Sequence, residues 1–379
     1  MIDSIVFYLY GNGEQFELRQ DNKLDGKKNQ QERGYGISSE YCNEYISSLS
    51  KQGIYCPSIT KAIKTNSKIG TREVLEIQVS LPKLIYGSNL FEIDSEDLDK
   101  IYAALLSRLN DFGIITTKEQ LQKAIVKRAD YSKIVKLPDY LGTADKVVEA
   151  ISKFNYKPSS DYNFHKYYCG NNGRSIKFWN TTQGYVIYDI IGNILANGFT
   201  KTEQTIIKGY NDRQVKRTAL RFELSLETKG SFDAVIRRKI KDTEKKKDFY
   251  LDEILKEDLA REILLDVFDK VFSNLAIGLL SLPEMENNRL MAYLDGSNLS
   301  VRKQEKLYYW ASLATSYGYG GFQEQVKLKH KGGSVDRCKK EIALILAELG
   351  EMNGSLPNLI KFLRTELEKF DIIKPKRVN

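Results

Sequence analysis

The sequence is poor in histidine, with only His165 and His330 among its 379 residues. An H-E-x-x-H motif and a histidine-rich metal cluster are therefore excluded, and a Ser-His-Asp triad would have to use one of these two residues. His165 lies in an aromatic stretch between Phe164 and Lys166. An imidazole in such a stretch is more often packed or solvated than bound to a metal.

Cysteine is also scarce, and its spacing defines no site. The four cysteines, at positions 42, 56, 169 and 338, include no C-x-x-C pair, so neither a zinc site nor a disulfide framework is indicated. No apolar run is long enough to span a bilayer, and the opening residues MIDSIVFYLYGNGE lack the basic start of a signal peptide. We therefore expect a cytoplasmic protein with no membrane partner.

Basic charge and tyrosine are plentiful. The net charge of +8 and the pI of about 8.9 favour a polyanionic partner, although many lysine-rich proteins are basic without binding one. The 23 tyrosines can stack on nucleic-acid bases, but most should pack with a buried ring and a solvated hydroxyl. The length allows two or three domains.

Hydrophobic periodicity divides the chain near residue 230 into a mixed part and a mainly helical part. The expected strands are 4–10, 74–81, 123–135, 176–180, 185–191 and 220–226; the expected helices are 39–51, 94–112, 143–154, 251–280, 302–316, 334–349 and 356–370, with a loop at 155–173.

The ten residues TALRFELSLE, 218–227, alternate apolar and polar side chains. This period of two predicts a strand with one face on a core. The other face then carries Arg221 and Glu223 side by side, an arrangement suited to holding a cation or a phosphate. Cross-strand ion pairs on a half-solvated antiparallel strand explain the same pattern.

A strongly basic run follows at residues 233–247. A solvated helix face is the ordinary explanation for such a run. In a basic chain it also suits a face that follows a phosphate backbone. Its cationic residues are Arg237, Arg238, Lys239, Lys241 and Lys245 to Lys247.

Polar residues that could bind a metal or act as a nucleophile fall on three expected strands. Asp130 and Glu223 would supply hard oxygen ligands if their strands are neighbours, and such ligands suit Mg²⁺ or Mn²⁺. A tyrosine hydroxyl is a candidate nucleophile toward a metal-bound phosphate, but its ordinary pKa of about 10 means that it needs a metal or a base to ionise. Each feature also has an ordinary structural explanation, and spacing alone does not single out Tyr188.

Five segments resemble a known family when they are taken in order. The opening MIDSIVFYLYG is similar to that family's first strand. The stretch that begins VLEIQVSLPKLIYGSNLFEI is similar to a family segment that reads S-P-x-K-x-x-x-G-H-N-x-F-G and precedes a helix. KRADYS resembles an R-I-D strand, YVIYDI the strand with a catalytic tyrosine, and LRFELSL an R-F-E strand. The family is that of the filamentous-phage replication initiators, the gene II type nicking endonucleases, which are related to the rolling-circle initiators of plasmids.

The resemblance implies a metal-dependent, site-specific DNA nickase. Tyr188 matches the nucleophile, Asp130 the aspartate of R-I-D, and Glu223 the glutamate of R-F-E, so the last two are the expected ligands of Mg²⁺ or Mn²⁺. Arg128 and Arg221 are expected to neutralise phosphate charge.

The chain departs from the family at two matched positions. Ser88 stands where the family has the histidine of G-H-N, so that imidazole is absent or moved, with His165 as its candidate replacement in the metal site. Ile190 stands where many relatives have a lysine two residues after the tyrosine.

The resemblance also sets the expected architecture and partners. We expect an α+β fold with a central antiparallel sheet and flanking helices, of the HUH or rolling-circle-initiator type, in a catalytic domain of residues 1–230. A mainly helical DNA-binding or accessory domain, residues 231–379, would follow. The expected partners are duplex origin DNA, its nicked strand, and a helicase and polymerase of a bacterial host. The alternative is an origin-binding regulator that does not cleave; a tyrosine recombinase fits poorly because it needs an Arg/His-rich constellation around its tyrosine.

Overall fold

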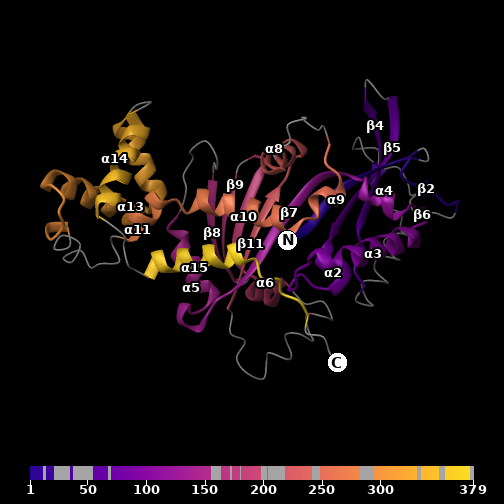
Figure 1. The fold of residues 1–379 in the computed structure, drawn as a ribbon, viewed down its shortest axis with the longest axis horizontal. Helices are drawn as coiled ribbons and strands as arrows, with labels where there is room; N and C mark the ends of the chain where they lie inside the picture. The colour runs from indigo at the N-terminus through magenta and orange to yellow at the C-terminus, as the bar shows by residue number, and fades with distance from the viewer. Residues whose placement is uncertain are drawn as a thin grey trace.

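The computed structural model describes most of the chain (Figure 1). The described residues are 1–11, 14–20, 35–36, 54–66, 70–154, 164–170, 173–179, 181–197, 203, 218–240, 248–281, 294–330, 334–349 and 355–375.

A nine-stranded sheet forms the centre of the described structure, and all its neighbouring strands pair antiparallel. Its spatial order is β3-β4-β5-β1-β7-β11-β10-β9-β8, so β7 is the middle strand. The strands are β1 (Ile2–Tyr10), β3 (Tyr35–Gly36), β4 (Ser58–Asn66), β5 (Gly70–Ser80), β7 (Ile125–Lys136), β8 (Phe164–Gly170), β9 (Gly173–Trp179), β10 (Gln183–Asp189) and β11 (Ala219–Leu226); β2 (Glu17–Leu18) and β6 (Ile114–Ile115) form a separate pair.

One face of the sheet is packed against helices. Aromatic rings on this face form a row that runs from Phe178 through Tyr185 to Phe222 and then to Phe268 of the covering helix, with centroid separations of 6.5, 6.4 and 6.0 Å. Such offset and edge-on contacts add to the burial of the rings. The alternation predicted for 218–227 is confirmed, because every second side chain from Leu220 to Leu226 is fully buried.

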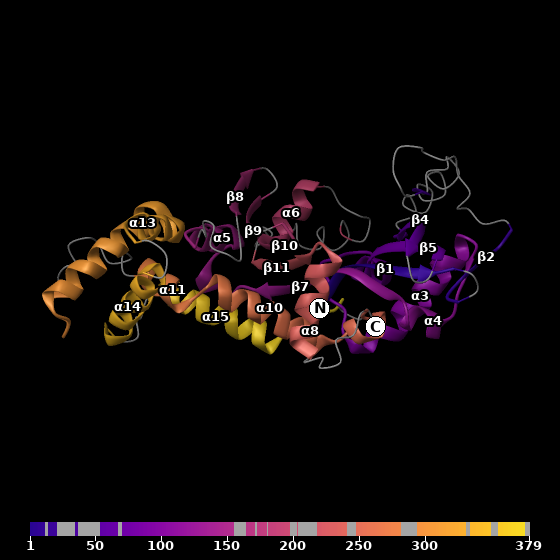
Figure 2. The same cartoon turned by 90° about the horizontal axis from the view of Figure 1, so that it is seen from above.

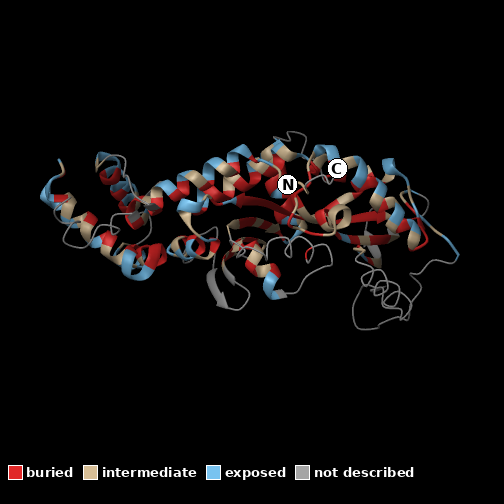
Figure 3. Ribbon diagram, turned by 90° about the horizontal axis from the view of Figure 1, so that it is seen from below, coloured by how far each residue is buried: buried red, intermediate tan, exposed pale blue. Residues whose placement is uncertain are grey.

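Helices cover this face, and buried and exposed residues alternate along their ribbons (Figure 3). The α-helices of the described structure as a whole, on either side of the sheet and beyond its end, are α2 (Leu81–Tyr86), α3 (Leu98–Asp111), α4 (Lys118–Gln122), α5 (Ala144–Ser152), α6 (Ile190–Asn197), α8 (Lys229–Ile240), α9 (Leu251–Ile254), α10 (Glu257–Val271), α11 (Asn274–Ser281), α13 (Val301–Lys329), α14 (Ser334–Leu349) and α15 (Ser355–Lys369).

The helical part does not stand apart from the sheet. α8, α10 and α15 lie on one side of the strands, whereas α6 lies on the other (Figure 2). α11, α13 and α14 pack together at the end of the molecule opposite β4. One hydrophobic core joins the sheet to α8, α10, α11, α13, α14 and α15, so it continues across residue 230, whereas the buried side chains of α6 belong to a separate small cluster. The structure is thus α+β with an antiparallel sheet and a helical C-terminal region, as expected.

Several expected elements differ in detail. The loop expected at 155–173 contains strand β8, and the single helix expected at 251–280 is divided into α9, α10 and α11. The helix expected at 302–316 continues to Lys329, with a kink at Gly318, whose φ of 71° is the left-handed region that favours glycine. The helix expected at 39–51 lies outside the described residues.

Candidate active site

Strand register brings the sequence-predicted residues to one face of the sheet. Across β10 and β11, Tyr188 is paired with Arg221. Across β11 and β7, Glu223 is paired with Ser132, two residues from Asp130. Because side chains alternate along a strand, these positions share a face, opposite the aromatic row. Tyr188, Arg221, Glu223 and Asp130 are therefore gathered from three neighbouring strands.

Tyr188 and Glu223 are joined directly. The Tyr188 hydroxyl donates a hydrogen bond to Glu223 Oε2 over 3.1 Å. The Tyr188 ring packs against a small apolar cluster that includes Leu90 and Ile134. Burial raises the pKa of the Tyr188 phenol above its ordinary value; the Arg221 guanidinium opposes this, and the Glu223 carboxylate adds to it. The phenol is therefore neutral at physiological pH and depends on a partner to lose its proton.

Glu223 is a carboxylate among other carboxylates. Burial is the largest cause that raises its pKa, Arg221 acts in the opposite direction, and the nearby Asp3 and Asp130 raise it further. Its side chain is 23% exposed, so it reaches the surface of the site. A carboxylate with a raised pKa that holds a tyrosine hydroxyl is suited to accept a proton or to meet a cation.

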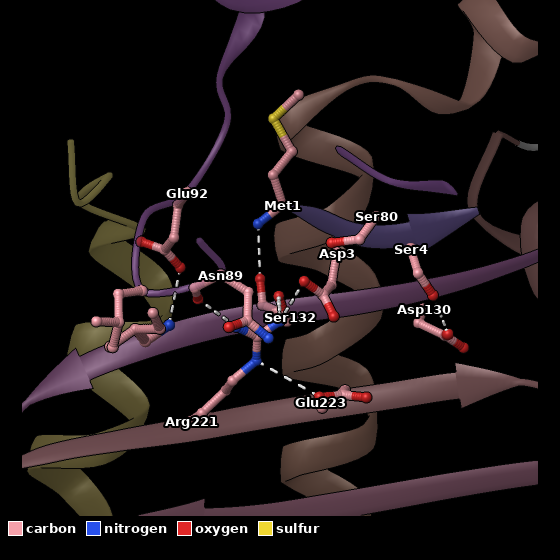
Figure 4. Close-up of polar contacts among 12 residues, drawn as sticks. Met1, Asp3, Ser4, Ser80, Asn89, Glu92, Asp130, Ser132, Arg221 and Glu223 are labelled. Carbon is pink, nitrogen blue, oxygen red and sulfur yellow. Dashed lines mark hydrogen bonds and ion pairs between the residues drawn. The ribbon is translucent and has the colours of Figure 1, made fainter. Parts of the chain in front are cut away.

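Arg221 lies below this surface rather than on it (Figure 4). Its side chain is 1% exposed. It donates to the carbonyl oxygen of Asn89 over 2.8 Å and to Ser132 Oγ over 3.0 Å. Its Nη2 lies 2.7 Å from Asp3 Oδ1, and its Nε lies 3.4 Å from Glu223 Oε2. The guanidinium thus contacts four protein groups, which does not support the predicted role of neutralising a DNA phosphate.

Asp130 and Arg128 form the exposed side of the cluster. Ser4 Oγ donates a hydrogen bond to Asp130 Oδ2, and Nη2 of Arg128 lies 3.2 Å from the same oxygen. The Arg128 side chain is 35% exposed, whereas Asp130 is almost buried. Arg128 is therefore the arginine of this site with a surface that can meet a phosphate.

A second ion pair supports the site from the other face of β7. Lys133 Nζ donates to Glu92 Oε2 over 2.5 Å and to the carbonyl oxygen of Asp371 over 2.7 Å. Glu92 also accepts from the backbone N–H groups of Ile134 and Ile373, over 2.8 and 3.1 Å. The pair thereby ties the segment after Asn89 and the C-terminal segment to the middle strand of the sheet.

We expect Lys133→Met to lower the free energy of unfolding by about 3–5 kcal/mol, because it leaves the Glu92 carboxylate buried without its cation. Urea denaturation followed by circular dichroism measures this. Lys136→Met, at the exposed end of the same strand, is the matched control. Adding Glu92→Gln to Lys133→Met should recover part of the loss. Equal stability of Lys133→Met and wild type would contradict the account of this pair.

The carboxylates fit a divalent cation in donor chemistry. Asp130 and Glu223 offer hard oxygens, and their mutual repulsion is a reason for the raised pKa of Glu223 that a cation would relieve. Mg²⁺ is commonly held by one or two carboxylates, with water and substrate phosphate completing its shell. Within the described ranges, no group of three or more His, Cys, Asp or Glu is arranged to hold a metal ion.

Two further positions singled out from the sequence are His165 and Ser88. The strand register pairs His165 with Phe178, and Phe178 with Tyr185. These register positions belong to the face of the sheet opposite Tyr188. The register thus gives no support for His165 as a metal ligand. Ser88, at the position of the family histidine, is buried and donates to Glu203 Oε1 over 2.9 Å.

The basic run has acidic partners where the structure describes it. On α8, Arg237 Nη2 lies 4.0 Å from Asp233 Oδ2, and Lys239 Nζ lies 3.5 Å from Oδ1 of Asp266 on α10. These pairs favour the interpretation of a solvated helix face for this part of the run. Residues 241–247 lie outside the described residues.

Sequence reasoning missed Asp3, Ser132 and the Glu92–Lys133 pair. Asp3 precedes an apolar strand, where an aspartate has no distinctive pattern. Lys133 lies at a position where alternation places a core residue, and this conflict was the one local signal that it has a buried partner.

Comparisons with known proteins add no relative. Neither the models of protein families, nor the curated proteins, nor the solved structures include a match to this chain. Among the described residues, no helix has both the length and the apolar character needed to cross a membrane.

Proposed function

We propose that this chain is a rolling-circle replication initiator that nicks origin DNA through Tyr188. The observation that carries the proposal is spatial. The segments that resemble the G-H-N, R-I-D, tyrosine and R-F-E motifs are far apart in sequence, yet Asn89, Asp130, Tyr188, Arg221 and Glu223 meet around one buried guanidinium and one hydrogen-bonded tyrosine. The antiparallel sheet, which brings these segments together, also supports a fold of the HUH or rolling-circle-initiator type.

In the proposed reaction, Tyr188 Oη attacks the scissile phosphorus in line. Its proton passes to Glu223 Oε2, which already accepts its hydrogen bond. The bond from phosphorus to the 3′ oxygen breaks, and the oxygen leaves with the electron pair and takes a proton from solvent. The products are a 5′-phosphotyrosine and a free 3′-hydroxyl that primes synthesis. The reverse attack rejoins the strand without ATP, because the phosphodiester energy is kept in the covalent link.

Asp130 and Glu223 are the residues that would hold Mg²⁺ or Mn²⁺, which would supply positive charge to a non-bridging phosphate oxygen. Arg128, at the exposed side of the site, pairs with the same phosphate. Arg221 serves the site from below by fixing Glu223 and the segment at Asn89.

The proposed partners follow from this chemistry. Duplex origin DNA is gripped mainly through its phosphates, in keeping with the net charge of +8. The nicked strand stays on the protein. In the cytoplasm of a bacterial host, a helicase separates the strands and a polymerase extends the 3′ end.

A denaturing gel tests the proposal. The protein is incubated with a supercoiled plasmid that carries the DNA flanking its coding sequence, and with a labelled single-stranded library of random sequence, in Mg²⁺, Mn²⁺ or EDTA. We expect nicked plasmid and a labelled protein band that resists denaturation, both lost in EDTA. Salt-sensitive binding with no covalent band in either metal would overturn the nickase and support the regulator that does not cleave.

A further inference from the structure

Asp3 is a third carboxylate at the candidate site, and the family resemblance assigns it no role. It lies near the start of β1, the strand on the other side of β7 from β11. Its side chain is 13% exposed, so it is shielded from solvent more than Glu223. It faces the cluster, as Figure 4 shows, with Arg221 between it and Glu223.

The distances decide which carboxylate Arg221 neutralises. Its Nη2 lies 2.7 Å from Asp3, whereas its Nε lies 3.4 Å from Glu223. Coulomb attraction weakens with distance, so the contact with Asp3 is the closer ion pair and the contact with Glu223 is the longer one. Glu223 is thereby the more weakly paired of the two carboxylates, next to the tyrosine hydroxyl.

The remaining contacts of Arg221 prevent it from turning away from Asp3. Asn89 and Ser132 accept hydrogen bonds from its two terminal nitrogens. Without Asp3, the guanidinium would keep one carboxylate partner, Glu223, in a nearly dry environment. It would then form a closer pair with Glu223, because an unpaired buried charge is costly.

We propose that Asp3 is a positioning residue that engages Arg221 and so keeps the Glu223 carboxylate available to Tyr188 and to a cation. This inference rests on the proposed nicking function, in which Asp3 acts through Arg221. Asp3 touches neither the scissile phosphate nor the tyrosine. Through Arg221 it sets the position of Glu223, the group that contacts the Tyr188 hydroxyl.

Single-turnover formation of the protein–DNA adduct tests this role in the full-length chain. The burst amplitude counts folded, active molecules, and the rate constant reports the chemical step in those molecules. We expect Asp3→Asn to lower the rate constant about 10- to 100-fold, as is usual for residues that orient a reacting group. The amplitude per folded molecule and the DNA concentration at half-maximal rate should stay within twofold.

Asp97→Asn is the matched control, because Asp97 is also buried and ion-paired, to Lys374 and Lys100, away from this cluster. It should lose stability without a change in rate constant. If Asp3→Asn does not fold, the smaller Asp3→Ser is measured in the same way. A folded Asp3 variant with a rate within twofold of wild type would overturn the proposal, as would failure of both variants to fold. No adduct in the wild type would instead refute the nicking function itself.

Discussion

Tyr188→Phe should abolish the covalent protein–DNA adduct and lower the rate of nicking by on the order of 10³-fold or more, because it removes the attacking oxygen. The ring stays in its apolar cluster with Leu90 and Ile134, so the fold and the affinity for DNA should be retained. Nicking of supercoiled plasmid and filter binding of the same DNA measure the two properties separately.

Tyr185→Phe is the matched control on the same strand. Its ring lies on the opposite face of the sheet, in the core row between Phe178 and Phe222. A hydroxyl deletion there should leave nicking within about twofold of wild type. Equal nicking by the Tyr188→Phe variant and wild type would remove Tyr188 from the proposed mechanism.

Glu223→Gln should lower nicking about 10²- to 10⁴-fold, the usual contribution of a positioned proton acceptor, while leaving origin binding nearly intact. The amide keeps the shape of the side chain but can neither accept the phenol proton nor supply a carboxylate to a cation. Glu227→Gln, at an exposed position just beyond the same strand, is the control.

Most substitutions of buried residues lower the free energy of unfolding, but Glu223→Gln is not expected to lower it. The pKa of Glu223 is raised in the folded protein by burial and by Asp3 and Asp130, in spite of Arg221. A raised pKa of a carboxyl group means that folding disfavours its charged form. At a pH where an exposed glutamate is ionised, a neutral amide at this position therefore costs the folded state less than the carboxylate does. We expect the free energy of unfolding of Glu223→Gln at pH 7 to equal or exceed that of wild type. A loss of fold would return this strand to a purely structural interpretation.

Local patterns predicted the parts of the fold that depend on local physics. The alternation in 218–227 determines which side chains of β11 are buried, and the capped amphipathic stretches gave α3, α5, α14 and α15 to within a few residues at their ends. β8 escaped prediction because asparagine and glycine flank it within 155–173 and are typical of a loop, although the aromatic residues of FHKYYCG themselves favour a strand. The extension of α13 escaped because a glycine-rich segment follows Ser316.

The candidate site required information that no local pattern holds. Alternation places Asp130 and Glu223 on the outward faces of their strands, but the pairing of β7 with β11 joins segments about 90 residues apart. The family resemblance supplied that neighbourhood as an expectation. It did not supply Asp3 or the burial of Arg221, since those depend on β1 packing beside β7 and on a carbonyl oxygen from Asn89.

The central claim is that Tyr188 forms the covalent link, and peptide mapping of the adduct tests it most directly. The wild-type protein is captured on labelled DNA, digested with protease and nuclease, and analysed by mass spectrometry for the peptide that carries a nucleotide. The account predicts one modified peptide, with the nucleotide on Tyr188. A nucleotide on another of the 23 tyrosines, or on a residue of another type, would contradict it.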